Sequence, residues 1–119
     1  MKYLLLIYEN EAGAAGVPEA EQGKIYQEYM DYTKRIRKNG NYVSGEALEP
    51  VSTATTVRVK NGKTLTTDGP FAETREQLGG FYLVEAKNLD EAIALAAGIP
   101  AVRTGSIEVR PIMPTPMPD

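Results

Sequence analysis

The sequence predicts an α+β fold of the ferredoxin-like βαββαβ type. Two continuous apolar runs, at residues 3–8 and 81–84, have the length of strands that are covered on both faces. A long amphipathic helix follows the first run, a shorter helix follows the second, and a strand of alternating apolar and charged residues closes the order. This order of strand, helix, hairpin, strand, helix and strand predicts a sheet with the two apolar strands at its centre and both helices on one face.

Length and charge limit the domain organisation and the partners. The 119 residues suit one domain, which we assign to residues 1–112, followed by a proline-rich tail at residues 113–119. The net charge of −3 provides no general basic surface, so we predict no nucleic-acid partner. The apolar start of the chain is too short to span a membrane, and we expect a cytoplasmic protein with no membrane partner.

The absence of two residue types excludes much familiar chemistry. The chain contains no cysteine, which excludes disulfides, thiolate metal sites and a cysteine nucleophile. It also contains no histidine, which is the usual base near neutral pH. The sequence shows no cluster of metal ligands, and we predict neither a metal nor a cofactor.

The first helix is predicted over residues 18–39, after a loop at residues 9–16 that is rich in glycine and alanine. Its buried stripe consists of apolar residues three or four positions apart, namely Ile25, Tyr29, Tyr32 and Ile36. Gly40 follows the last turn and is expected to end the helix in a left-handed conformation.

A hairpin is predicted around the pair Asn61–Gly62, after a short extended segment at residues 42–48. A three-residue loop that ends at a left-handed glycine pairs Val57 with Leu65. A two-residue turn pairs Val57 with Thr66 instead, which moves the partners by one position. We favour the three-residue loop.

The stretch from Thr67 to Glu85 joins this hairpin to the second apolar strand. It is expected to contain a tight turn, a short helical turn and a glycine pair, with Glu73 and Gln77 on one face of the helical turn. Asn88 is predicted to cap the helix that follows. The closing strand is predicted at residues 107–110.

The two apolar strands also predict the assembly. Two helices cover only one face of a sheet, yet the central strands are apolar on both faces. A second copy of the chain is the economical cover for the other face, so we predict a homodimer whose sheets pack face to face. The alternative is a solvated second face, softened by the hydroxyl groups of Tyr3, Tyr8 and Tyr82.

The run Asp68–Thr74, followed by residues 76–81, resembles the signature of the YCII-related family, specifically its DGPF group. The opening at residues 1–8 and the closing at residues 105–111 match the same family. The resemblance implies a dimeric α+β barrel built on the ferredoxin-like fold. The group is largely uncharacterised, and relatives occur near or fused to extracytoplasmic-function sigma factors. Some shorter relatives carry a proposed His-Asp pair, which has no counterpart here.

Seven residues are candidates for ligand binding: Tyr8, Glu46, Asp68, Arg75, Tyr82, Glu108 and Arg110. Asp68 is the candidate catalytic residue, as a general base or polar anchor beside a cleft, and the alternative is that it only stabilises a turn. Glu108 and Arg110 project to one face of a strand, where they form an ion pair or contact a ligand. The two tyrosines donate hydroxyl groups to the same cavity, or serve as core aromatics.

These residues leave more than one function open. Our leading hypothesis is a homodimeric small-molecule-binding domain with a cleft at the sheet face. The alternatives are a regulatory interaction module associated with sigma-factor systems, and a histidine-free isomerase-like or lyase-like enzyme that uses Asp68. The sequence does not decide between binding and catalysis.

Overall fold

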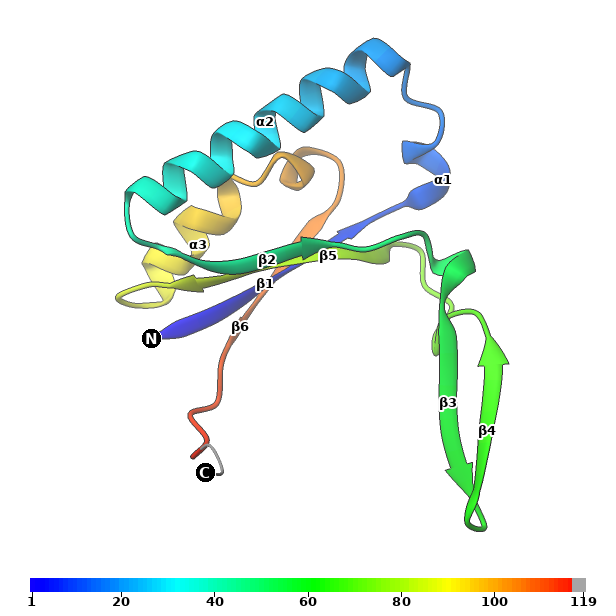
Figure 1. Cartoon of the computed structure of the whole chain (residues 1–119). Helices are drawn as coiled ribbons and strands as arrows, with labels where there is room; N and C mark the ends of the chain where they lie inside the picture. Colours follow the sequence, from blue (N-terminus) through cyan, green and yellow to red (C-terminus); the bar gives the residue numbers. More distant parts are fainter. Residues whose placement is uncertain (117–119) are drawn as a thin grey trace.

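A four-stranded antiparallel sheet lies beneath two helices in the computed structural model, which describes residues 1–116 (Figure 1). The central strands are β1 (Lys2–Glu9) and β5 (Gln77–Glu85), and the edge strands are β2 (Tyr42–Ala47) and β6 (Ser106–Pro111). The strand order is β2-β5-β1-β6. This confirms the ferredoxin-like α+β fold and the central position of the two apolar strands.

Both longer helices pack on the same face of the sheet (Figure 1). In α2 (Glu19–Lys38), Tyr32 and Ile36 of the predicted stripe are buried, with 2% and 1% of their surface exposed. The second helix, α3 (Leu89–Ala97), buries the small residues of its inner face. The largest fully buried side chains of the core are Leu5, Ile36, Val84 and Ile99.

Gly40 ends α2 as predicted, with φ of 81°. Its backbone N–H donates to the Arg37 carbonyl oxygen at 3.1 Å, and the Asn41 N–H donates to the Ile36 carbonyl oxygen at 2.9 Å. This pair of hydrogen bonds is the Schellman motif, which satisfies carbonyl groups that the end of the helix leaves free. The next segment can therefore turn directly into β2.

Two helices begin at asparagine caps. Asn88 accepts a hydrogen bond from the Glu91 N–H at 2.9 Å, which confirms the predicted start of α3. The segment that we expected to be a loop contains a short helix, α1 (Glu11–Ala14), because Asn10 accepts from the Gly13 N–H at 3.1 Å.

The hairpin stands apart from the sheet. Its strands β3 (Thr55–Lys60) and β4 (Lys63–Asp68) pair only with each other and project from the sheet on the side opposite the helices (Figure 1). The predicted order had counted the hairpin among the strands of the sheet. Instead, the short extended segment at residues 42–48 supplies the edge strand β2, and the hairpin is inserted after it.

The predicted three-residue hairpin loop is wrong. Val57 pairs with Thr66, and the turn consists of Asn61 with φ of 52° and Gly62 with φ of 75°. Two consecutive left-handed residues are typical of the two-residue type I′ turn, whose twist matches that of the strands. Asparagine adopts the left-handed region at low cost, so no third residue is needed.

The predicted helical turn at Glu73 and Gln77 is also wrong. Residues 71–76 contain two bends and no helical turn, and Gln77 is the first residue of β5. The Gln77 side chain donates from Nε2 to the Thr74 carbonyl oxygen at 2.6 Å and accepts from the Glu11 N–H at 2.9 Å. These bonds attach the loop to the body, so the loop needs no helical hydrogen bonds of its own.

The remaining segments are short. Two 3₁₀ turns, η1 (Val51–Thr53) and η2 (Pro100–Arg103), lie before the hairpin and before β6. Of the tail predicted at residues 113–119, residues 113–116 contain no helix or strand, and residues 117–119 lie outside the described residues. Within the described chain, no helix combines the length and apolar character needed to cross a membrane.

Two glycines of β5 provide a test of how closely β2 and β5 approach. A Cβ atom at Gly80 would lie 2.8 Å from the Glu46 carbonyl oxygen, whereas a Cβ atom at Gly79 meets nothing within 4 Å. We expect Gly80→Ala to lower the free energy of unfolding by about 1–3 kcal/mol, because a backbone atom must move. Gly79→Ala should change it by less than about 0.5 kcal/mol. Urea denaturation of both variants measures the free energy of unfolding. Equal losses of stability in the two variants would contradict the close approach of β2 to Gly80.

Candidate functional site

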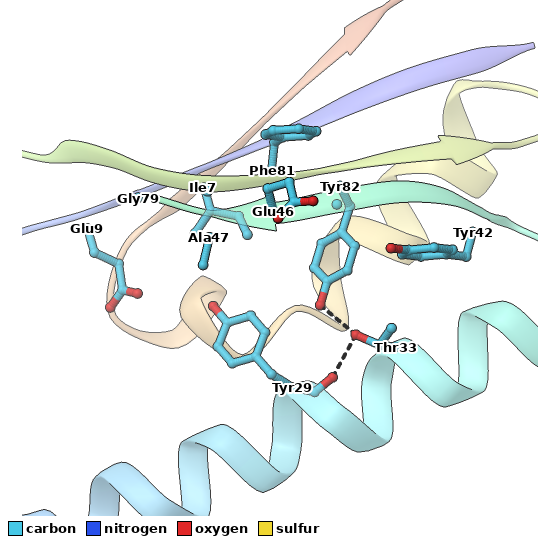
Figure 2. A pocket seen from close by; sticks show the side chains of 12 residues that line it. Ile7, Glu9, Tyr29, Thr33, Tyr42, Glu46, Ala47, Gly79, Phe81 and Tyr82 are labelled. Carbon is cyan, nitrogen blue, oxygen red and sulfur yellow. Dashed lines mark hydrogen bonds between the residues drawn. The ribbon is translucent and has the colours of Figure 1, made fainter. Parts of the chain in front are cut away.

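A cleft of about 380 Å³ lies between α2 and the part of the sheet formed by β2 and β5. Tyr29 and Thr33 come from α2, Tyr42 comes from β2, and Tyr82 comes from β5 (Figure 2). The rings of Tyr29 and Tyr82 extend from the helix and from the sheet into the space between them (Figure 2). The volume lies within the range of pockets that hold small organic molecules.

Glycines explain why the sheet leaves room at this point. Gly45 on β2 and Gly80 on β5 both line the cleft and carry no side chain that would fill it. At Gly45, a Cβ atom would lie 2.9 Å from the ring of Tyr82. The glycine therefore lets the Tyr82 ring lie directly against the backbone of β2, and the cleft forms beside it.

A chain of hydrogen bonds connects the two walls of the cleft. Thr33 Oγ1 donates to the Tyr29 carbonyl oxygen at 2.8 Å, and lies 2.8 Å from the Tyr82 hydroxyl oxygen (Figure 2). Because a hydroxyl group has one proton to donate, the Tyr82 hydroxyl is the donor to Thr33. The order of donation is Tyr82 to Thr33 to the backbone of α2, which fixes the Tyr82 side chain.

Aromatic contacts hold the same tyrosine from both sides. The ring of Tyr82 lies 5.2 Å from that of Tyr32 and 6.4 Å from that of Tyr42, both edge to face. The guanidinium of Arg37 lies 4.6 Å from the centre of the Tyr42 ring. This wall of the cleft is therefore formed before any ligand binds.

Tyr29 and Tyr82 keep their protons at neutral pH. Burial, and to a smaller extent the nearby Glu9 carboxylate and Tyr82, raise the pKa of Tyr29 to about 12. Burial also raises the pKa of Tyr82, while its hydrogen bond with Thr33 acts in the opposite direction. Both hydroxyl groups are thus neutral hydrogen-bond donors and acceptors, and neither is poised to act as a base.

The charged side chain that faces the cleft is acidic. Glu9 lines the cleft, no lysine or arginine does so within the described part of the chain, and Glu46 borders it but pairs with Phe81, so its carboxylate lies on the other face of the sheet. Glu9 also accepts a hydrogen bond from Thr104 Oγ1 at 3.0 Å.

A second hollow, of about 590 Å³ between α1 and α2, shares Glu9 and Tyr29 with the cleft. In residues 1–116, no three histidine, cysteine or acidic side chains are grouped to hold a metal ion.

The structure separates the seven residues that the sequence proposed. Tyr82 lies in the cleft, and Glu46 lies at its edge with its side chain on the face of the sheet that carries Phe81. Tyr8, Glu108 and Arg110 lie on the opposite face of the sheet, which no helix of the described chain covers. There the Tyr8 hydroxyl donates to Glu108 Oε1 at 3.4 Å. Tyr8 and Tyr82 therefore do not share a cavity.

Asp68 and Arg75 lie away from the cleft. Asp68 is the exposed last residue of β4, and Arg75 is exposed in the loop that follows. The turn after Asp68 is held by the backbone: Gly69 has φ of 101°, and its N–H donates to the Ala54 carbonyl oxygen at 2.8 Å. Thr56 Oγ1 adds a hydrogen bond to the Gly69 carbonyl oxygen at 2.8 Å.

The sequence did not identify three residues that form the cleft, Tyr29, Thr33 and Tyr42. Tyr29 had been placed only on the buried stripe of the helix. A signal was available, since a buried tyrosine usually needs a hydrogen-bond partner and threonine lies on the same side of α2. The edge position of Tyr42 depends on strand pairing that the local sequence does not specify.

Comparison with known proteins identifies the family. The model of the YCII-related domain matches residues 1–116. The chain belongs to the YCII-related domain family. A relative from Rhizobium meliloti (strain 1021), the uncharacterized protein R00369, is 35% identical over 114 residues, which cover 94% of this chain and 92% of the relative. The family that the residues around Asp68 suggested is thus confirmed.

A solved structure shares the fold of this YCII-related chain. It is 5-chloro-2-hydroxyhydroquinone dehydrochlorinase (TftG) from Burkholderia phenoliruptrix AC1100, in complex with 2,5-dihydroxybenzoquinone. The TM-score is 0.51 with 15% sequence identity, and the match covers 95% of this chain and 94% of that chain. At this identity the likeness shows the fold alone.

The raised pKa of Tyr29 predicts a loss of stability in alkali. A tyrosine in the unfolded chain releases its proton near pH 10, whereas folded Tyr29 keeps it to about pH 12. Its contribution is therefore fully present below pH 10 and is lost as the pH rises to about 12. Urea denaturation between pH 8 and 12 should show that the free energy of unfolding falls less steeply with pH for Tyr29→Phe than for the wild type. Tyr26→Phe, at a position that is 67% exposed, is the matched control and should behave like the wild type.

Proposed function

We propose that this YCII-related domain binds a small organic molecule in the cleft between α2 and the sheet. The observation that carries the proposal is the preformed wall of tyrosines beside a strand surface kept bare by Gly45 and Gly80. Binding sites for small molecules combine such apolar walls with a few fixed polar groups. Here the polar groups are the hydroxyls of Tyr29 and Tyr82.

The lining of the cleft limits the class of ligand. Aromatic rings favour a flat ring that can pack against them, and neutral hydroxyl groups favour a partner with hydroxyl or carbonyl oxygens. Glu9 opposes an anion, because no lysine or arginine of the described chain lines the cleft to offset its charge. We infer an uncharged, hydroxylated ring compound as the ligand.

The structural neighbour supports the choice of probe. TftG has the same fold and holds 2,5-dihydroxybenzoquinone, a flat ring with oxygen substituents. A ligand of that kind matches the aromatic and hydroxyl lining of this cleft. Our proposal concerns binding only, and it gives no group in the cleft a role in a reaction.

Calorimetric titration with hydroquinone and catechol tests the ligand class. We expect both neutral rings to bind, and 4-hydroxybenzoate, a matched anion, to bind more weakly. Tyr29→Phe should weaken binding about threefold to tenfold, because it removes one neutral hydrogen bond and keeps the ring. Tyr8→Phe, on the other face of the sheet, should leave the affinity unchanged.

Three results would contradict this assignment of the cleft. They are the absence of binding by either neutral ring, stronger binding by the anion, and equal losses of affinity in Tyr29→Phe and Tyr8→Phe.

Asp68→Ala provides a separate check on the candidate catalytic residue. Because Asp68 lies outside the cleft, selective loss of binding in this variant would place the ligand at the hairpin instead.

We propose further that the domain is a homodimer formed through the open face of its sheet. On this face Leu4 pairs with Leu83, and Leu6 pairs with Phe81, across the two central strands. All four side chains are only half-buried in one copy of the chain. Such a contiguous apolar patch is typical of an interaction surface.

The charges on this face surround the apolar centre. Glu46 lies beyond Phe81 on one edge strand, while Glu108 and Arg110 lie beyond Leu6 and Leu4 on the other. An apolar centre with a polar rim is the usual arrangement of an interface between proteins. A two-fold axis presents the same face twice, so one patch serves both copies.

Light scattering coupled to size-exclusion chromatography tests the dimer. The wild type should have twice the 13.0 kDa mass of one chain at micromolar concentration. Leu6→Lys should give a folded monomer, because a charge would be buried at the centre of the interface. Ile93→Lys adds the same charge at a position on α3 that is 50% exposed, and should leave the dimer intact. A monomeric wild type would refute the proposal.

A further inference from the structure

The β3–β4 hairpin forms an arm, residues 55–68, that extends beyond the body of the domain (Figure 1). The radius of gyration of the Cα atoms is 16.6 Å. A compact domain of this length has a radius of gyration of about 13–14 Å. No other helix or strand of the described chain packs extensively on the arm.

The register gives the arm two unlike sides. Val57 pairs with Thr66 and Val59 pairs with Thr64, so these four uncharged, β-branched side chains share one side. We call this the valine side. The other side carries the basic residues of the arm, Arg58, Lys60 and Lys63, together with Leu65, which pairs with Arg58.

The valine side is too exposed for a hairpin that stands alone. Val57 has 59% and Val59 has 69% of its surface exposed to solvent. A two-stranded hairpin is at best marginally stable in water unless a further surface packs against it. Free strand edges that bear valines would also invite unwanted pairing with other chains. The arm therefore needs a cover that its own chain does not provide in the described residues.

We propose that the arm clasps a second copy of the chain, with its valine side against the flank of the partner's sheet. The proposal rests on the homodimer proposed above. The arm projects on the same side of the sheet as the open apolar face, which is where the second copy would lie (Figure 1). By two-fold symmetry, each copy gives one arm and receives one.

The reach of the arm fits this partner. A strand of six residues extends about 20 Å, whereas two sheets packed face to face lie about 10 Å apart. An arm that starts at the edge of one sheet therefore passes the level of the second sheet and ends beside the second copy. Val57 lies about 7 Å and Val59 about 13 Å beyond Thr55, so the two valines lie on either side of that level.

The distribution of charge favours the same partner. The arm has three basic residues and one acidic residue, a net charge of +2 within a chain whose net charge is −3. The rest of the chain is therefore at −5. An arm that lies on another copy brings its net positive charge near an acidic body, which favours association even though the basic side faces away from the contact. Lysine and arginine stems can follow the surface while their charged ends remain in water.

The first experiment compares the two sides of the arm by sedimentation of a dilution series. Val57→Ser with Val59→Ser should weaken the dimer at least about tenfold, because two apolar contacts are lost. Arg58→Ser with Lys60→Ser is the matched control, and at 0.5 M salt it should change the dissociation constant by less than about threefold. Thermal unfolding checks that both variants keep a folded body.

The second experiment locates the arm directly. Because the chain has no cysteine, Val59→Cys and Lys60→Cys each provide a single thiol for a benzophenone maleimide. Irradiation should give abundant covalent dimers from Val59→Cys, with cross-links to a strand of the main sheet, and far fewer from Lys60→Cys.

The outcomes separate the arm from the dimer. If the wild type is a dimer but the valine variant has the same dissociation constant and neither thiol gives covalent dimers, the arm proposal is wrong and the dimer through the sheet stands. If the wild type is a monomer, both proposals fail. If the two variants weaken the dimer equally, charge and not the valine side holds the arm, which also overturns the proposal.

Discussion

The antiparallel pairing of β1 with β5 is the constraint on which the other features of this protein depend. Because successive side chains point to opposite faces of the sheet, one strand register determines which apolar side chains face the helices and which face the open side. Leu5 and Val84 face the helices and are fully buried, whereas Leu6 and Leu83 face the open side. A shift of one residue would exchange these sets. The core, the cleft above the sheet and the apolar patch below it therefore share one structural origin.

The sequence predicted those parts of the fold whose cause is local. Continuous apolar runs identified β1 and β5, and the spacing of Tyr32 and Ile36 identified the buried stripe of α2. The position of the hairpin was not predictable in this way. Alternation and an Asn61–Gly62 turn show that two strands pair with each other, but not whether they join a larger sheet. That outcome depends on β2, whose short, glycine-containing sequence is a weak strand signal.

The candidate site was harder to predict, because proximity in space depends on faces and gaps. Tyr8 and Tyr82 had been assigned to one cavity, but they lie on opposite faces of the sheet. Their positions relative to each other follow from the β1–β5 register, which is irregular after Ile7. The cleft itself exists where side chains are missing, at Gly45 and Gly80. A sequence pattern identifies residues that fill space more readily than those that leave it open.

The protonation state of the cleft favours recognition over proton transfer. Burial holds the Tyr29 and Tyr82 hydroxyls in their neutral form, so near pH 7 they can donate hydrogen bonds but cannot accept a proton as bases. The Tyr82 proton is already directed to Thr33, which leaves the oxygen of Tyr82 free to accept a hydrogen bond from a ligand. The Tyr29 ring and hydroxyl then supply the complementary donor. A neutral molecule with both a hydroxyl group and a flat ring satisfies these groups together, whereas an anion would be repelled by the carboxylate of Glu9.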